Sequence, residues 1–239
     1  MKRLFLLPIL LMSFSIFSCS SGTSAKEEKT ADTTAAVTPA PIEKKPVFTP
    51  FKVAYIQHRV KDFNAWQAAY FAHDSIRKTY GLSHLILGRD VKDSNLVYIV
   101  NKMDDLARAQ AFAVAPTLKQ VMMKAGVISK PGFSYAEVVR NDESPVETND
   151  RLGVAHHVKD FNIWLKAYDA EGISARMANG LADRMIARSL IDSNMIYITF
   201  AVTDMSKAKA RLASPELKKI MTDAGVDSPP TMRWYRLIK

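Results

Sequence analysis

The side chains in this sequence that are best suited to chemistry recur at matching places. His58 begins the words HRVKDFNAW, and His156 begins HHVKDFNIW, 98 residues later. Imidazole changes its charge near neutral pH, so a buried histidine found twice in one setting is a candidate base or ligand-binding group. A core histidine that is hydrogen-bonded to its neighbours would give the same pattern, and both interpretations stay open.

Arg89 and Arg188 form a second matched pair, within the segments SHLILGRDV and DRMIARSL. A guanidinium can hold an anion through two parallel hydrogen bonds, so an arginine at the mouth of a pocket would suit an anionic ligand. An ion pair with an acidic neighbour is the alternative for both residues.

A stripe of aromatic and polar residues follows each histidine motif. In the first copy its members are three or four residues apart, which places them on one helical face; they are Trp66, Tyr70, His73 and Arg77. The second copy has Trp164, Tyr168, Glu171 and Arg176 at the matching places. Since one copy of a duplicated site can keep a function while the other becomes support, we expect an asymmetric site near His73, Arg77 and Arg89. Alternatively, the aromatic residues belong to the core and His73 is a partly exposed helix residue.

A third set lies on the strand that precedes each motif, where alternate residues point to opposite faces. The face away from His58 carries Tyr55, Gln57 and Arg59, and the face away from His156 carries Gly153, Ala155 and His157. If these two faces line a shared interior, the first repeat fills its half with large side chains, and the small residues of the second repeat leave its half open. We therefore expect one off-centre pocket with four residues on its wall, namely Tyr55, Gln57, Arg59 and His157.

The sequence predicts no metal site and no cofactor. It has neither the H-E-x-x-H nor the H-x-x-E-H spacing, and the neighbours His156 and His157 point to opposite faces of a strand. His58 and His156 could share a metal only if their two strands meet. No set of nucleophile, base and acid, and no phosphate-binding loop, is found in the sequence.

The N-terminus has the composition of a targeting segment. Lys2 and Arg3 precede a short apolar stretch from Leu4 to Phe17, which is shorter than the roughly 20 residues that a membrane-spanning helix needs. The stretch ends in IFSCSSG, and Cys19 is the single cysteine of the chain. This resembles a bacterial lipoprotein signal, in which residues 1–18 are removed and Cys19 carries lipid. An ordinary secretory signal is the alternative.

Residues 19–50 are predicted to be a disordered tether, because their Ser, Thr, Ala, Pro, Lys and Glu cannot bury enough apolar surface to order the chain.

The net charge of the full chain is +9, and removal of Lys2 and Arg3 leaves +7 on the rest. A basic domain on a lipid tether would suit anionic lipid or an acidic ligand, or its charges are simply solvated. No Lys/Arg-rich run exists, so we expect no nucleic-acid partner.

Two copies of one domain are expected, at 51–141 and 151–239, joined by a linker at 142–150. In the first copy, alternating apolar residues predict strands at 53–60, 83–91, 96–103 and 132–139. Helical spacing predicts one helix between an Asp62 cap and Gly81, and a second at 104–126 that is interrupted at Pro116. The second copy repeats this order, with one residue inserted after Tyr168. The order βαββαβ is that of the ferredoxin-like fold, in the α+β class.

A sheet with helices on one face must bury the other face. Two copies in one chain can turn their open faces together, so we expect an intramolecular dimeric α/β barrel and a monomeric chain. The sequence resembles dimeric α/β-barrel proteins, the superfamily of the antibiotic-biosynthesis monooxygenases. The motifs that carry the resemblance are V-K-D-F, the D-S-N turns and S-P-E-L-K followed by A-G-V. In that superfamily two subunits usually pair, and the resemblance implies that this one chain supplies both.

Three functional hypotheses follow, and the sequence leaves open whether the protein is an enzyme. The first is a lipid-anchored protein of the bacterial cell envelope that binds a small anionic or aromatic ligand or has a structural role. The second, implied by the resemblance, is a cofactor-independent oxygenase that acts on an aromatic substrate. The third, also implied by the resemblance, is a haem-binding protein, for which His58, His73 and His156 are the candidates.

Overall fold

The computed structural model describes residues 48–238 of the chain. The predicted signal at 1–18, the lipidated Cys19 and nearly all of the predicted tether lie outside the described residues. Within the described part, no helix is both long and apolar enough to cross a membrane.

The first repeat contains four strands and four helices in the expected order. They are β1 (Phe51–Arg59), α1 (Phe63–Ala72), α2 (Asp74–Thr79), β2 (Leu82–Asp90), β3 (Leu96–Met103), α3 (Leu106–Val114), α4 (Pro116–Lys124) and β4 (Gly132–Asn141). Asp62 caps α1, because its carboxylate accepts a hydrogen bond from the Ala65 amide at 2.7 Å. Pro116 begins α4, so the interruption predicted in the second helical region is confirmed.

The second repeat has the same order: β5 (Asp150–His157), α5 (Phe161–Glu171), α6 (Ile173–Ala178), β6 (Leu181–Ser189), β7 (Met195–Val202), α7 (Met205–Ala213), α8 (Pro215–Asp223) and β8 (Thr231–Leu237). One expectation was wrong in both repeats. The first helical region is two helices, separated at His73 in one repeat and at Gly172 in the other.

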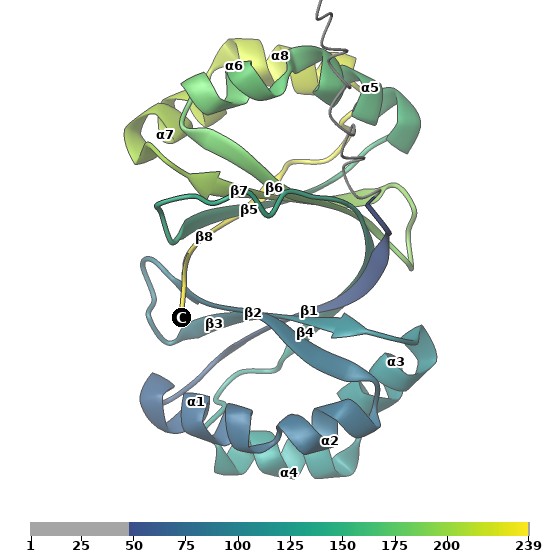
Figure 1. Ribbon diagram of the computed structural model, residues 1–239, viewed down its shortest axis with the longest axis vertical. Coiled ribbons are helices and arrows are strands. Elements are labelled where there is room, and N and C mark those ends of the chain that lie inside the picture. Colours follow the sequence, from purple (N-terminus) through teal and green to yellow (C-terminus); the bar gives the residue numbers. More distant parts are fainter. Residues whose placement is uncertain (1–47, 239) are drawn as a thin grey trace, which may run out of the picture. The chain divides into compact units, whose positions relative to one another are not determined.

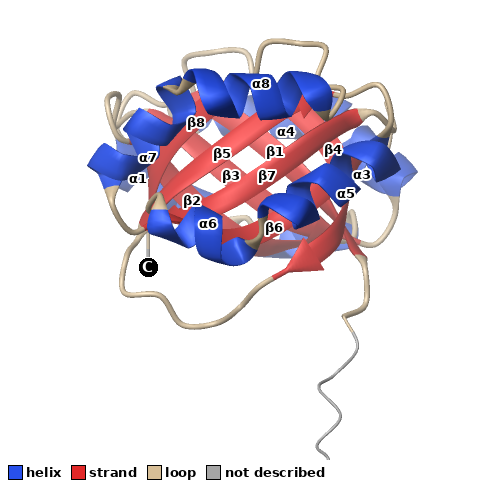
Figure 2. Cartoon of the chain, turned by 90° about the horizontal axis from the view of Figure 1, so that it is seen from above, coloured by secondary structure: helices blue, strands red, loops and turns tan. Residues whose placement is uncertain are grey.

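The eight strands form one closed antiparallel barrel, in the order β1-β3-β2-β8-β5-β7-β6-β4. Within each repeat this is the ferredoxin-like order, and the repeats join where β2 pairs with β8 and β4 pairs with β6. Figure 1 shows helices α1–α4 on one side of the barrel and α5–α8 on the other. Figure 2 shows the strands crossing beneath the helices of the second repeat. The predicted tandem ferredoxin-like barrel is confirmed.

Two kinds of buried layer result from this arrangement. Apolar residues on the outer face of each half-barrel pack under the helices, as Ile56 and Val60 do in the first repeat, in one cluster with Trp66 of α1. Residues on the inner face point into the barrel, where Val53, Val138 and Met185 close one part of the interior. His58 and His156 belong to the outer layers, and the strands that carry them are not neighbours in the barrel.

Candidate functional site

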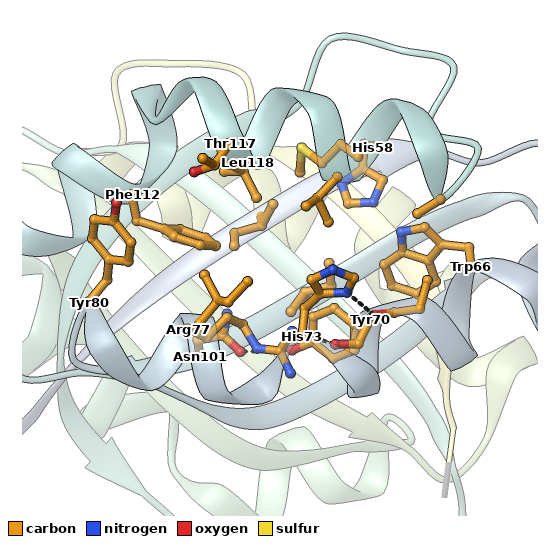
Figure 3. Close-up of a pocket in the computed structure, with 17 residues that line it drawn as sticks. His58, Trp66, Tyr70, His73, Arg77, Tyr80, Asn101, Phe112, Thr117 and Leu118 are labelled. Carbon is orange, nitrogen blue, oxygen red and sulfur yellow. Dashed lines mark hydrogen bonds between the residues drawn. The ribbon is translucent and has the colours of Figure 1, made fainter.

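A cavity of about 70 Å³ lies between the sheet and the helices of the first repeat. Figure 3 shows His58 and Trp66 at one end of it, Tyr80 and Phe112 at the other, and Tyr70, His73, Arg77 and Asn101 between them. Most of the wall is apolar, and it is completed by Ile56, Ala69, Ile76, Ile99, Leu118, Val121, Met122 and Ala125. A few polar groups that converge in an apolar cavity are typical of a small-molecule site.

His58 has only 2% of its surface exposed, and its ring meets Trp66 edge to face at a centroid distance of 5.3 Å. Neither ring nitrogen has a hydrogen-bond partner among the described residues. Burial lowers the pKa of His58 to about 4, because the charged ring would lose its hydration. The imidazole is therefore neutral at pH 7, with one N–H donor that lacks a protein acceptor.

Tyr70 links the cavity to the surface. Its hydroxyl donates to Asn101 Oδ1 at 2.9 Å and lies 3.0 Å from His84 Nδ1, on an exposed imidazole. With the Asn101 oxygen engaged in this way, the Asn101 Nδ2 group is a buried donor without a partner among the described residues. Burial, opposed by the nearby Arg77 charge, raises the pKa of Tyr70 to about 12. The phenol therefore remains protonated at neutral pH.

Arg77 is the charged group of the site, and it is 4% exposed. Its guanidinium stacks on the Tyr70 ring at 3.8 Å from the centroid and donates to the Tyr70 carbonyl at 2.5 Å. The acidic partner of Arg77 is Asp74 at 3.2 Å, whose side chain is 35% exposed. His73 lies where α1 ends, with Nδ1 2.7 Å from the Ala69 carbonyl oxygen. The site thus holds a buried cation whose only carboxylate is near solvent.

The second repeat has the corresponding cavity, of about 80 Å³, but its charged groups bind one another. Asp183 accepts two hydrogen bonds from Arg176, at 2.8 and 2.7 Å, and one from the Tyr168 hydroxyl at 2.9 Å. Glu171 accepts from Arg211 at 2.6 Å and lies 3.6 Å from Arg176. Burial, together with the acidic neighbours, raises the pKa of Tyr168 well above its usual value. Carboxylates thus compensate the buried cations of this repeat.

The polar groups in and beside the two cavities differ. Among the equivalent positions, the first repeat has His73, His84, Asn101 and Phe112 where the second has Glu171, Asp183, Phe200 and Arg211. The pair of His58 and Trp66 is shared, as His156 and Trp164, with a centroid distance of 5.8 Å. His156 also lacks hydrogen-bond partners among the described residues, and burial lowers its pKa to about 4. The shared histidine is therefore part of the common framework, and the four differing residues give the first cavity its own character.

Tyr55 and Gln57 line a second cavity, inside the barrel, together with Gly153 and Ala155. Arg59 and His157 do not line it. Arg59 binds Asp93 at 2.7 Å, and His157 binds Asp227 at 2.7 Å. The Asp227 carboxylate raises the pKa of His157.

Arg89 and Arg188 line neither the helix–sheet cavities nor the barrel cavity. Each donates from Nε to a backbone carbonyl in the following turn, Ser94 or Ser193, and each lies over a phenylalanine ring. The ion pair considered from the sequence is absent for both within the described residues. These arginines therefore stabilise the turn of the same hairpin in each of the two repeats.

His58 and His156 do not meet, because β1 and β5 are on opposite halves of the barrel. The part of the chain that the structure describes contains no group of three or more His, Cys, Asp or Glu placed to hold a metal ion.

The sequence reasoning missed three residues: Asn101 and Arg233, which line the cavities, and His84, which contacts the Tyr70 hydroxyl. Asn101 interrupts the apolar strand LVYIVNKM, and its equivalent in MIYITFAV is Phe200. A residue-by-residue comparison of the two copies would have found both, since Asn101 differs from Phe200 in polarity and His84 differs from Asp183 in charge.

Comparison with known proteins shows the fold. No family model and no curated protein matches the sequence. Among solved structures, an anthrone oxidase-like protein matches with a TM-score of 0.54 and 13% identity, over 79% of this chain and 92% of that chain. A candidate monooxygenase from Fusobacterium nucleatum matches with a TM-score of 0.50 and 14% identity, over 80% of this chain and 93% of that chain. These shares correspond to both repeats, so the chain has the duplicated ferredoxin-like barrel fold of these proteins.

Proposed function

We propose that the first repeat binds a small, mainly aromatic molecule that carries an oxygen acceptor, such as a ketone, quinone or phenol. One observation carries the proposal. The first repeat has Asn101 where the second repeat has Phe200, and the side-chain amide of Asn101 is a buried, unpaired donor in the wall of an apolar cavity. An unpaired buried polar group costs roughly 1–3 kcal/mol, so a protein that keeps one gains from it elsewhere.

Two donors beside Tyr70 are buried without a partner among the described residues, and both belong to residues that line the cavity: Asn101 Nδ2 and Arg77 Nε. The surrounding wall of Trp66, Tyr70 and aliphatic side chains suits the rest of an aromatic molecule. Because the second repeat pairs its own cations with carboxylates, we assign no ligand to its cavity and regard it as structural support.

Cofactor-independent oxygenation of an aromatic substrate is the second candidate function. The buried, unpaired amide donor of Asn101 supports it, because such a donor would stabilise the oxyanion that forms when the substrate loses a proton. The fold shared with the anthrone oxidase-like protein also favours it. A pKa near 4 makes His58 a weak base, so binding is our first proposal. Haem binding is less well supported, since a cavity of about 70 Å³ is far below the roughly 300 Å³ or more of a cofactor site.

Calorimetric titration of the purified full chain with the single-ring probes phenol and hydroquinone tests the binding proposal, in parallel with the Asn101→Phe variant. We expect binding to wild type and at least a tenfold loss in the variant, which copies the second repeat. Phe200→Leu is the matched control at the equivalent position and should bind as wild type does. Equal binding by Asn101→Phe and wild type would refute the site. Oxygen uptake with hydroquinone, measured with an electrode, separates oxygenation from binding alone.

We also propose that Cys19 carries lipid and anchors the protein to a membrane of the bacterial envelope. The basic Lys2 and Arg3, the short apolar stretch and the single cysteine support this. Labelling cells with an alkyne analogue of palmitate should modify wild type and not Cys19→Ala, and only wild type should sediment with membranes. Labelling of the variant would show that the anchor is elsewhere.

A further inference from the structure

The closed barrel encloses a cavity of about 350 Å³ that receives side chains from both repeats. Interiors of proteins are close-packed, and an eight-stranded barrel either fills its interior with side chains or holds one small ligand. Glycine and alanine at positions 153 and 155 stand where the first repeat has Tyr55 and Gln57. A methyl group added at Gly153 would meet only ordinary contacts, with the nearest atom, on Tyr235, at 3.7 Å. The backbone at position 153 would therefore accept a larger side chain, so backbone packing does not require the cavity to be open.

Four tyrosine rings form much of the wall, in two pairs that each join the repeats. Tyr55 and Tyr197 have centroids 5.1 Å apart, and Tyr98 and Tyr235 have centroids 5.4 Å apart. Two of the hydroxyls are engaged elsewhere, since Tyr55 donates to Met185 Sδ at 3.8 Å and Tyr98 donates to Asp90 at 3.0 Å. The rings thus offer the cavity aromatic surface that suits a flat, unsaturated ligand.

The charge on the wall of this cavity is positive. Among the described residues no carboxylate lines it and Arg233 is its one ionised side chain, while Asp90 lies behind the wall, where it accepts from the Tyr98 hydroxyl. Arg233 Nε points at Gln57 Oε1 across the repeat boundary, at 3.5 Å, and Arg233 has no acidic partner within 4 Å among the described residues. Arg151 on β5 adds a second positive charge near Tyr235, and is bound only to backbone carbonyls in the described part of the chain.

We propose that the barrel interior is a second binding site, for a one- or two-ring aromatic carboxylate. Its rings lie among the four tyrosines, and its carboxylate pairs with Arg233, which Gln57 holds in place. This site is independent of the helix–sheet cavity, because it uses the opposite face of the sheet and residues of both repeats. The first repeat has Ser134 at the position of Arg233, so the barrel holds one such cation and one ligand.

Titration of the full chain with 2-naphthoate and with its neutral analogue 2-naphthamide tests the proposal by calorimetry. We expect 2-naphthoate to bind with one site per chain, and 2-naphthamide to bind at least tenfold more weakly. Arg233→Gln should weaken 2-naphthoate at least tenfold, and Gly153→Leu, which fills the cavity from a tolerant position, should abolish binding. Arg236→Gln is the matched control, since Arg236 lies on the same strand but is exposed and bound to Asp150.

Failure of this site is distinguishable from failure of the helix–sheet site. Asn101→Phe should leave 2-naphthoate binding unchanged, because Asn101 does not line the barrel cavity. Absence of 2-naphthoate binding to wild type, or equal binding by wild type, Arg233→Gln and Gly153→Leu, would overturn the proposal. Equal affinity for 2-naphthamide would overturn the assignment of an anionic ligand.

Discussion

His84 and Asp183 occupy equivalent positions in the two repeats, and each contacts the hydroxyl of the tyrosine that packs over it. His84 Nδ1 lies 3.0 Å from the Tyr70 hydroxyl, and Asp183 accepts from the Tyr168 hydroxyl at 2.9 Å. The consequence for the neighbouring arginine is opposite in the two repeats. Arg176 gains a bidentate carboxylate from Asp183, whereas Arg77 has to rely on Asp74 near the surface. This difference gives Arg176 a buried carboxylate partner and leaves Arg77 with one that is near solvent.

Asp183→Asn is expected to lower the free energy of unfolding by about 3 kcal/mol, because it leaves the Arg176 charge buried without its main partner. Urea denaturation of the full chain followed by circular dichroism measures this change. Asp142→Asn is the control, since Asp142 lies 3.8 Å from Arg184 and is 48% exposed. Its loss should cost less than about 1 kcal/mol. Equal effects of the two substitutions would contradict the role that we give to Asp183.

His84→Asp transfers the second repeat's arrangement to the first. The new carboxylate would face Arg77 and Tyr70, so we expect the free energy of unfolding to rise by about 1 kcal/mol. His84→Asn has nearly the same shape without the charge and should give no such gain. The same denaturation experiment applies to both, and a loss of stability in His84→Asp would show that Arg77 is already compensated.

The sequence predicted the parts of this structure that depend on local chemistry. Asp62 caps its helix, Pro116 begins one, and the apolar alternation around His58 gives the strand. These features follow from hydrogen bonding and side-chain period within a few residues. The barrel also followed, because a half-covered sheet repeated in one chain has an obvious partner in its own second copy.

The parts that could not be predicted depend on contacts between distant residues. Arg59 and His157 lie on strands whose alternation pointed inward, yet both turn to aspartates in loops, Asp93 and Asp227. The break between α1 and α2 at His73 could not be predicted, because the first repeat has neither Pro nor Gly there. In the second repeat Gly172 occupies the corresponding break. The role of Arg233 depends on Gln57, 176 residues away in sequence, so no local pattern reveals it.

Two glycines test the backbone of the repeats. Gly180 has φ +74, and a Cβ there would lie 2.4 Å from the Asp204 carbonyl oxygen, whereas Gly172 has φ +83 with open space around it. Gly172 has φ +83 and ψ 150, a region that is essentially restricted to glycine, so Gly172→Ala should cost about 1–3 kcal/mol for the backbone conformation alone. Gly180→Ala should cost about 1–3 kcal/mol more, because the backbone must also move. Thermal unfolding of the two variants gives the comparison, and equal midpoints would contradict it.

The two buried histidines predict a loss of stability in mild acid. Burial lowers the pKa of both His58 and His156 from 6.5 to about 4. Between pH 6.5 and pH 4 these two histidines are protonated in the unfolded chain but not in the folded chain. The free energy of unfolding is therefore highest above pH 6.5 and falls as the pH falls toward 4. At pH 5 each histidine should contribute a loss of up to about 2 kcal/mol relative to pH 7.5, measured by urea denaturation at both pH values.

His58→Leu and His156→Leu should each remove one half of this pH dependence, whatever their effect on stability at pH 7.5. His157→Gln is the control of opposite sign. Asp227 raises the pKa of His157, so the stability that His157 contributes is present at low pH and is lost as the pH rises through its folded pKa. Its removal should make the protein relatively less stable at pH 5. If His58→Leu and His156→Leu retain the full wild-type difference between pH 7.5 and pH 5, the histidines are protonated in the folded state and must have polar partners there.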